Sequence, residues 1–190
     1  VKKFEAWKNG LTGWPFFDAC MRYLIATGWI NFRMRAMLQS VASYTLWLPW
    51  RESGNHLARL FLDYEPGIHW SQVQMQSGVT GINSVRAYSV KKQSLDHDFE
   101  GFFIRKWVPE LKKVPNEFIH EPWLMDEISQ KESGCIIGKD YPKPIVDETE
   151  SRKIGISKTY SAKSNPLVKV RSKIVYELHG SRRKRKKKKK

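Results

Sequence analysis

The chain has 190 residues, which is enough for one hydrophobic core but not for two large domains. Its formal net charge is +15, and the run Arg182–Lys190 supplies nine of these charges, which leaves +6 for the other 181 residues. Such an excess fits a polyanionic partner, but it equally fits lysines that only keep a surface soluble. The two cysteines lie far apart, which argues against a disulfide framework and a zinc site.

The N-terminal segment shows no secretory signal, and no apolar run approaches the roughly 20 residues that a membrane span needs. We therefore expect a cytoplasmic or nuclear protein that is neither secreted nor bound to a membrane. The chain begins with Val1 and not with Met, which favours truncation or processing upstream.

The first clear helix is predicted to begin at Trp14-Pro15, because proline is favoured at an early helical position. One face of this helix is apolar at spacings of three and four residues, and Gly28 is expected to end it. The residues of that face are Phe17, Cys20, Met21, Leu24 and Ile25.

Further helices are expected over residues 31–48, ended by Pro49, and over residues 51–64. Pro66-Gly67 is interpreted as a turn before a short helix over residues 68–76. Residues 79–100 are expected to be irregular, and residues 102–107 helical.

Beyond residue 114, prolines at positions 115, 122, 142, 144 and 166 are expected to break any long element. No segment alternates strongly enough to predict a sheet. The fold class is therefore all-α over residues 1 to about 125, followed by an irregular C-terminal extension that wraps the body and a solvated tail. The pure basic tail indicates general attraction to phosphates or a nuclear-localisation signal, without sequence readout.

The sequence lacks several common catalytic and binding motifs. Neither a glycine-rich phosphate loop nor a nucleophile elbow is present, and the five histidines lack metal-ligand spacing. A metal site is therefore not expected.

One polar and aromatic cluster remains, spread over two expected helices and the turn after them. A buried arginine here needs an acidic partner, which either Asp63 or Glu65 could provide. The cluster fits a structural ion pair or a polar wall around a planar ligand, and spacing alone favours the ion pair. Its members are Trp29, Arg33, Arg35, Trp50, Asp63, Glu65, His69 and Trp70.

The order of these residues is similar to that of a known family. Residues 7–35 read WKNGLTGWPFFDACMRYLIATGWINFRMR, which resembles the cryptochrome/DNA photolyase pattern W-x-x-G-x-T-G-[YW]-P-x-x-D-A-x-M-R-x-L-x-x-T-G-W-x-x-x-R-x-R. The resemblance continues through Trp50-Arg51-Glu52, through LDYE at residues 62–65 and through LDHDFEGFFIRKWVPEL at residues 95–111. It ends with HEPW at residues 120–123 and YPKPIVD at residues 141–147.

This resemblance implies that residues 1–147 are the C-terminal part of a helical FAD-binding domain. Residues 148–181 would be an extension of uncertain structure, and residues 182–190 a disordered polybasic tail. The N-terminal antenna domain of the family, and the earlier part of the FAD-binding domain, would lie outside this chain. A monomer is expected.

The resemblance also implies roles for single residues around FAD. Trp29 would lie against the flavin pocket, and Arg35 and Asp63 would pair beside the ring. Asp63 and Glu65 would lie near the polar pyrimidine edge, and His69 would face the flavin N5.

Other positions concern DNA and electron transfer. Arg33 would face DNA phosphate or the lesion, and Met75 occupies the position of the lesion-facing tryptophan. Trp50 matches the middle member of the family's electron-transfer chain, whereas Val73 replaces the flavin-proximal tryptophan. Trp70 or Trp47 could substitute for it.

The implied function is light-driven electron transfer from reduced FAD to a pyrimidine dimer in damaged DNA, after which the dimer splits and the electron returns. The enzyme would then be a deoxyribodipyrimidine photolyase, a carbon-carbon lyase. The alternatives are a cryptochrome photoreceptor without repair activity, and a truncated fragment or basic binding module that is inactive alone.

Overall fold

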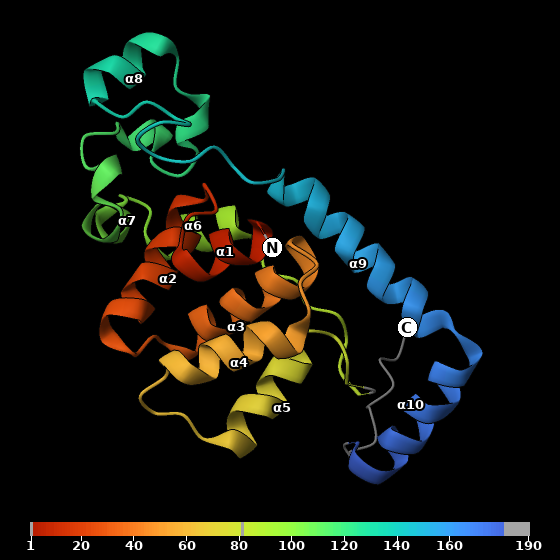
Figure 1. Cartoon of the computed structure of the whole chain (residues 1–190). Helices are drawn as coiled ribbons and strands as arrows, with labels where there is room; N and C mark the ends of the chain where they lie inside the picture. The colour runs from red at the N-terminus through yellow and green to blue at the C-terminus, as the bar shows by residue number, and fades with distance from the viewer. Residues whose placement is uncertain (1, 81, 181–190) are drawn as a thin grey trace, which may run out of the picture.

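The computed structural model describes residues 2–80 and 82–180, and within these ranges it is helical, with one isolated β-bridge between Ile137 and Tyr141. The all-α prediction is thus confirmed. In chain order the α-helices (Figure 1) are α1 Lys2–Asn9, α2 Pro15–Thr27, α3 Phe32–Ser40, α4 Trp50–Leu60, α5 Pro66–Gln76, α6 Val90–His97, α7 Phe102–Trp107, α8 Glu127–Ser133, α9 Glu148–Ser164 and α10 Pro166–His179. A π-helical turn covers Val41–Thr45, and short 3₁₀ turns cover Pro109–Leu111, Asn116–Phe118 and Pro122–Leu124.

Helix α2 begins and ends where the sequence predicts. Pro15 occupies its first turn, and Gly28 ends it in the left-handed conformation with φ of 68°. The Gly28 backbone N–H donates to the Leu24 carbonyl at 2.8 Å. This sharp end redirects the chain into α3, where the Asn31 side chain accepts from the Met34 backbone N–H.

Several predicted boundaries are wrong. The helix expected over residues 31–48 is α3 followed by the π-helical turn, and Trp47 then takes a positive φ of 55°. Pro66-Gly67 is not a separate turn but the first turn of α5, because proline needs no hydrogen-bond acceptor there. The segment expected to be irregular contains α6, which the Ser89 side chain caps.

The irregular C-terminal extension is also a wrong prediction, because α9 and α10 occupy most of it. Asp147 caps α9 by accepting from the Glu150 backbone N–H at 2.7 Å. Pro166 starts α10 where it was expected to break an element, and Asn165 caps that helix. The tail of residues 182–190, predicted to be disordered, lies outside the described residues.

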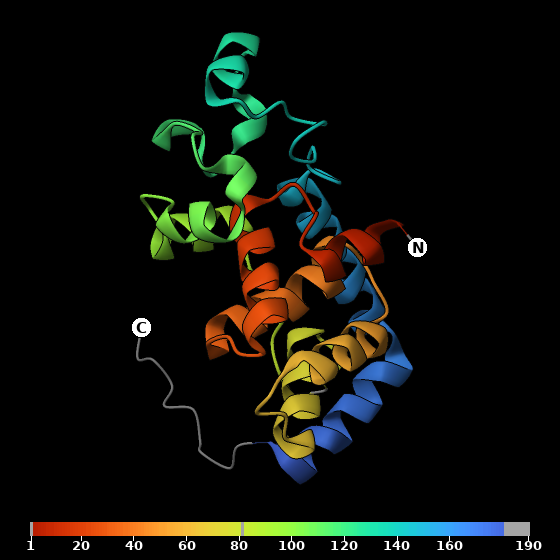
Figure 2. The ribbon, with the colours of Figure 1, turned by 60° about the vertical axis from the view of Figure 1, so that its left-hand side comes forward.

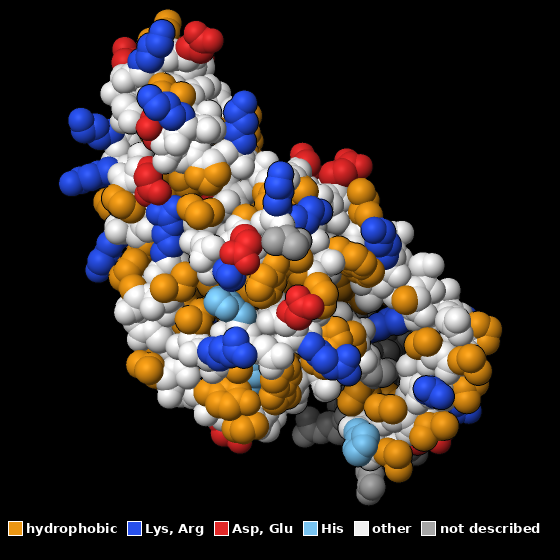
Figure 3. All heavy atoms as spheres, in the orientation of Figure 1, with side chains coloured by type: hydrophobic (Ala, Val, Ile, Leu, Met, Phe, Trp, Pro, Cys, Tyr) orange, Lys and Arg blue, Asp and Glu red, His pale blue; other side chains and the backbone are white. Residues whose placement is uncertain are grey.

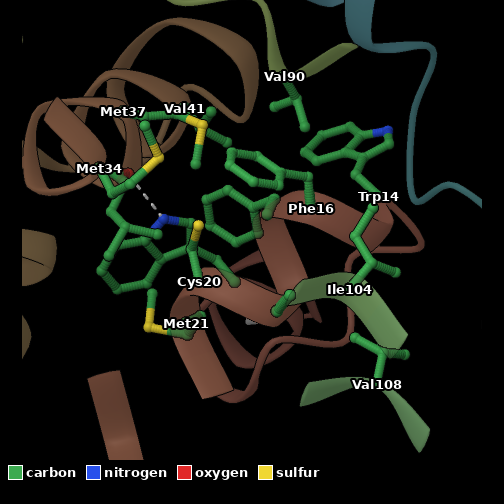
Figure 4. Close-up of a cluster of buried hydrophobic side chains, with 14 of the residues drawn as sticks. Trp14, Phe16, Cys20, Met21, Met34, Met37, Val41, Val90, Ile104 and Val108 are labelled. Carbon is green, nitrogen blue, oxygen red and sulfur yellow. Dashed lines mark hydrogen bonds between the residues drawn. The ribbon is translucent and has the colours of Figure 1, made fainter. Parts of the chain in front are cut away.

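The hydrophobic core surrounds α2. Figure 4 shows Met34, Met37 and Val41 pointing toward Phe16 and Cys20 of α2. Ile104 and Val108, from α7 and the residue after it, lie on another side of the same cluster. The buried Trp7 indole of α1 donates to the Leu38 carbonyl at 3.0 Å, which ties the N-terminal helix to α3.

A buried carboxylate joins distant parts of the chain. Asp18 accepts hydrogen bonds from the Thr12 backbone and hydroxyl, from the Gly13 backbone and from the Tyr141 hydroxyl. Burial raises the pKa of Asp18 to about 6, while these hydrogen bonds act in the opposite direction. The network fixes the start of α2 against the segment that leads to α9.

Helix α9 packs against the π-helical turn, and Figures 1 and 2 both show it leaving the body and continuing toward α10. A Cβ atom on Gly155 would lie 1.9 Å from the Tyr44 carbonyl oxygen, so only glycine allows this approach. Side chains of α10, including Leu167, Val170 and Leu178, are exposed, and apolar side chains gather there in Figure 3.

Candidate functional site

A cavity of about 350 Å³ lies between α3, the end of α4 and α5. The helices converge there because Gly28 and the loop at residues 61–65 turn the chain back toward the same end of the body. Its lining residues are Trp29, Ile30, Asn31, Phe32, Arg35, Ala36, Gln39, Leu57, Phe61, Asp63, Tyr64, Glu65, Ile68, His69, Gln72, Val73 and Gln76.

An ion pair stands in the cavity lining. Arg35 Nη2 lies 2.8 Å from Asp63 Oδ2, and Arg35 Nε donates to the Ile30 carbonyl at 2.7 Å. The guanidinium also lies 4.3 Å from the centre of the Phe61 ring. The pKa of the Asp63 carboxyl is lowered, chiefly because Arg35 donates a hydrogen bond to it.

The sequence left Asp63 and Glu65 as alternative partners for the arginine, and the structure selects Asp63. Glu65 instead caps α5, where its Oε2 accepts from the Ile68 backbone N–H at 2.6 Å. Both carboxylates line the cavity. The two carboxylates therefore place negative charge at one edge of the cavity, and the positive charge of Arg35 compensates the charge of Asp63.

His69 is only 8% exposed, and its Nε2 lies 2.9 Å from the Gly54 carbonyl oxygen of α4. A carbonyl oxygen only accepts, so Nε2 carries the proton and Nδ1 of the neutral ring is left as an acceptor. Burial, followed by the nearby charge of Arg35, lowers the pKa of His69, while the Gly54 hydrogen bond opposes this shift. The ring is thus held neutral, in one tautomer.

The remaining walls are largely apolar. Leu57, Phe61 and Val73 are buried behind the cavity, whereas the Trp29 and Phe32 side chains are 48% and 58% exposed. Two half-exposed aromatic faces beside an ion pair suit a flat ligand, because a flat ring needs apolar contact and a few polar groups at its edge.

Five of the residues predicted for cofactor binding thus meet in one cavity: Trp29, Arg35, Asp63, Glu65 and His69. The other predicted residues stand elsewhere. Arg33 is exposed and Met75 is half-buried, and neither side chain lines this cavity. Trp50 lines a separate surface hollow with Trp70.

Aromatic rings connect that hollow with the cavity. The Trp50 and Trp70 ring centres are 6.4 Å apart, and those of Trp70 and His69 are 5.1 Å apart. The Trp70 indole donates to the Tyr64 hydroxyl at 3.2 Å. A Cβ on Gly54 would lie 2.9 Å from the Trp70 ring, so this glycine lets the indole lie close against α4.

Sequence reasoning missed the amide side chains of the cavity. Gln39 of α3 and Gln72 and Gln76 of α5 all line it. Residues 72 and 76 are four apart and therefore lie on one helix face, and this spacing was the only sign in the sequence that they act together. Glutamine has no catalytic motif of its own, so that signal pointed to no ligand.

The lining fits the FAD that the resemblance implies. The two half-exposed aromatic faces supply apolar area, and the ion pair supplies polar contacts at one edge. Two buried side-chain oxygens in the lining, Gln39 Oε1 and Gln72 Oε1, have no hydrogen-bond partner among the described residues. A ligand with donor groups would satisfy them.

Within residues 2–80 and 82–180, no group of three His, Cys, Asp or Glu side chains is placed to hold a metal ion. No helix in the same ranges has the length and apolar character required to span a bilayer.

Comparison with known proteins gives one consistent result. The family described as the FAD binding domain of DNA photolyase matches residues 1–161. A deoxyribodipyrimidine photo-lyase of Alkalihalophilus pseudofirmus is 36% identical over 154 residues, which are 80% of this chain and 32% of that protein. A cryptochrome DASH of Synechocystis is 35% identical over 150 residues, which are 78% of this chain and 31% of that protein.

The same relationship appears among solved structures. A bacterial class III photolyase from Agrobacterium tumefaciens superposes with a TM-score of 0.79 at 31% identity, over 86% of this chain and 34% of that one. The chain therefore spans about a third of the length of the relatives it matches. The match confirms FAD as the cofactor of this kind of domain. The chain belongs to the family of FAD-binding domains of DNA photolyases and cryptochromes.

Proposed function

We propose that this chain forms one side of a flavin pocket in a photolyase-type flavoprotein, which uses light to transfer an electron from reduced FAD to a pyrimidine dimer in DNA. The observation that carries the proposal is the Arg35–Asp63 ion pair in the lining of a cavity whose other walls include exposed aromatic faces. When bound, FAD supplies the light-absorbing electron donor.

The chain's own residues bind and orient the ring. The Arg35 guanidinium provides positive charge beside it, and Asp63 holds that guanidinium in place. Neutral His69 donates from Nε2 to the Gly54 carbonyl, so its Nδ1 would be available to accept a hydrogen bond from an N–H group of the ring. Trp29 and Phe32 cover the ring and exclude water.

The partners in this proposal are damaged DNA and the upstream part of the parent protein. Arg33 is exposed on α3, next in sequence to the cavity-lining Phe32, and there it can contact a phosphate. We place Met75, which is half-buried, on the side that faces the lesion. We place residues 1–147 in the flavin domain and expect a monomer.

The test begins with flavin retention. The chain is incubated with FAD and passed through gel filtration, and we expect flavin absorption to stay with the protein at the elution volume of a monomer. Asp63→Ala should lose most of the flavin while the helical circular-dichroism signal is kept, because Arg35 then loses its partner at the ring. Arg33→Ala is the matched control, since Arg33 lies outside the cavity lining.

Repair is tested next, with light and dimer-containing DNA. Flavin retention together with light-dependent loss of dimers supports the photolyase function. Flavin retention without repair favours the cryptochrome photoreceptor, a class that is also present among the relatives. A wild-type chain that elutes without flavin would show that the upstream part is needed and that this chain is inactive alone.

A further inference from the structure

The orientation of the buried Gln39 amide follows from counting hydroxyl protons. Gln39 Nε2 lies 2.9 to 3.0 Å from the hydroxyl oxygens of Ser43, Ser53 and Ser77. Each hydroxyl proton is already used elsewhere. Ser43 donates to Ser77, Ser77 donates to the Val73 carbonyl, and Ser53 donates to the Trp50 carbonyl.

Because all three hydroxyls donate elsewhere, their oxygens are left as acceptors, and the two hydrogens of the Gln39 NH₂ group serve two of them at a time. We therefore orient the amide with its NH₂ group toward the serines, which leaves Oε1 on the other side. Gln39 is 2% exposed, and its Oε1 has no donor within the part of the chain that the structure describes.

The cavity contains a second buried acceptor that lacks a hydrogen-bond donor. Gln72 Oε1 of α5 is shielded from solvent and has no donor among the described residues. Both glutamines line the cavity, one from α3 and one from α5. A buried oxygen without a donor destabilises the free protein, so two of them at one cavity indicate that a ligand supplies donors there.

We propose that Gln39 and Gln72 form an acceptor subsite in this cavity, distinct from the Arg35–Asp63 pair, that binds N–H or O–H donors of a planar heterocyclic ligand. The inference rests on the proposed flavin function and adds to it a set of contacts that select for donor groups. Ring N–H groups and the hydroxyls of the ribityl chain have the same donor chemistry.

Gln72→Met is the decisive variant. The Gln72 side-chain oxygen has no hydrogen-bond donor among the described residues, so the substitution breaks no such bond in the free protein. The unliganded variant should melt at the same temperature as wild type or higher, since an unsatisfied acceptor is removed. Riboflavin affinity, measured by fluorescence quenching, should fall about tenfold. Gln74→Met is the matched control, because Gln74 is exposed on α5 and lies outside the lining of this cavity.

A purely structural role for Gln72 predicts the opposite pattern, with melting temperature and affinity falling together. Lumiflavin, which lacks the hydroxyl chain, separates the two donors. Weaker binding of both flavins assigns the donor to the ring, and weaker binding of riboflavin alone assigns it to the chain hydroxyls.

Unchanged affinity of Gln72→Met for both flavins, with wild type binding them, would overturn the acceptor subsite and leave the flavin function intact. A wild-type chain that binds neither flavin would overturn the flavin site of this chain, and this inference with it. Gln39→Met, which also breaks the serine network, should lose both affinity and stability.

Discussion

At the scale of single residues, the decisive feature is how each polar side chain of the cavity is fixed. Asp63 pairs with Arg35, Glu65 caps α5 and His69 donates to Gly54. None of these partners can be deduced from spacing, because Asp63 and Glu65 are equally near in sequence. The family resemblance predicted the Arg35–Asp63 pair, whereas the Gln39–serine network needed coordinates, since its members come from separate elements.

The protonation of His69 leads to a pH prediction. The unfolded chain binds a proton at His69 near the usual pKa of 6.5, whereas the folded chain resists protonation because burial lowers that pKa. The unfolded state therefore binds more protons below pH 6.5, and the contribution of His69 to stability is lost as the pH falls from 6.5 toward the lowered value.

We expect the free energy of unfolding of wild type to fall between pH 7 and pH 5 by more than that of His69→Asn, measured by urea denaturation. Burial also lowers the pKa of His56, which both proteins retain. The contribution of His69 is therefore given by the difference between the pH profiles of wild type and His69→Asn. Parallel pH profiles would contradict the assignment of a neutral, buried His69.

At the scale of elements, the sequence predicts helix positions better than helix ends. Proline and glycine marked α2 correctly because they act locally. The ends of α3 and α4 are set by the π-helical turn and by the chain turning at residues 61–65, which depend on packing. The two C-terminal helices were missed because Pro166, which was expected to break an element, starts α10, and because the helix-capping signal of Asp147 at the start of α9 was not used.

The crossing of α4 and α5 also bears on electron transfer. The resemblance implies that Val73 occupies the position of the family's flavin-proximal tryptophan, so we expect the chain through Trp50 to be interrupted there. Trp70 lies between Trp50 and the cavity-lining His69, with ring centres 6.4 and 5.1 Å away. We therefore expect Trp70, of the two predicted substitutes, to complete the route.

Trp70→Phe should slow light-driven reduction of bound flavin by at least tenfold in the presence of an external thiol, because phenylalanine is much harder to oxidise. Trp47→Phe is the matched control, since Trp47 contacts Lys158 of α9. The rate is read from the loss of flavin absorption during illumination. Equal rates for wild type and Trp70→Phe would exclude Trp70 from the route.

At the scale of the whole molecule, the charge is very unevenly distributed. Nine of the fifteen net positive charges lie in residues 182–190, and the remaining 181 residues carry +6. Each phosphate that a basic residue neutralises contributes about −0.9 to the slope of log K against log salt concentration for duplex DNA. In the proposed complex with DNA, the tail would offer up to nine phosphate contacts and thus a large share of the salt dependence of binding.

Replacing the nine basic residues with serine should therefore reduce the magnitude of that slope by several units, measured by fluorescence anisotropy with a labelled duplex over a series of salt concentrations. Phosphate contacts carry no base readout, so the loss should be equal for undamaged and dimer-containing DNA. Arg33→Ala should likewise weaken binding to both duplexes, by about one phosphate contact, because the proposed contact of Arg33 is to a phosphate. A serine tail that weakened binding to the dimer alone would contradict the general electrostatic role and place the tail at the lesion.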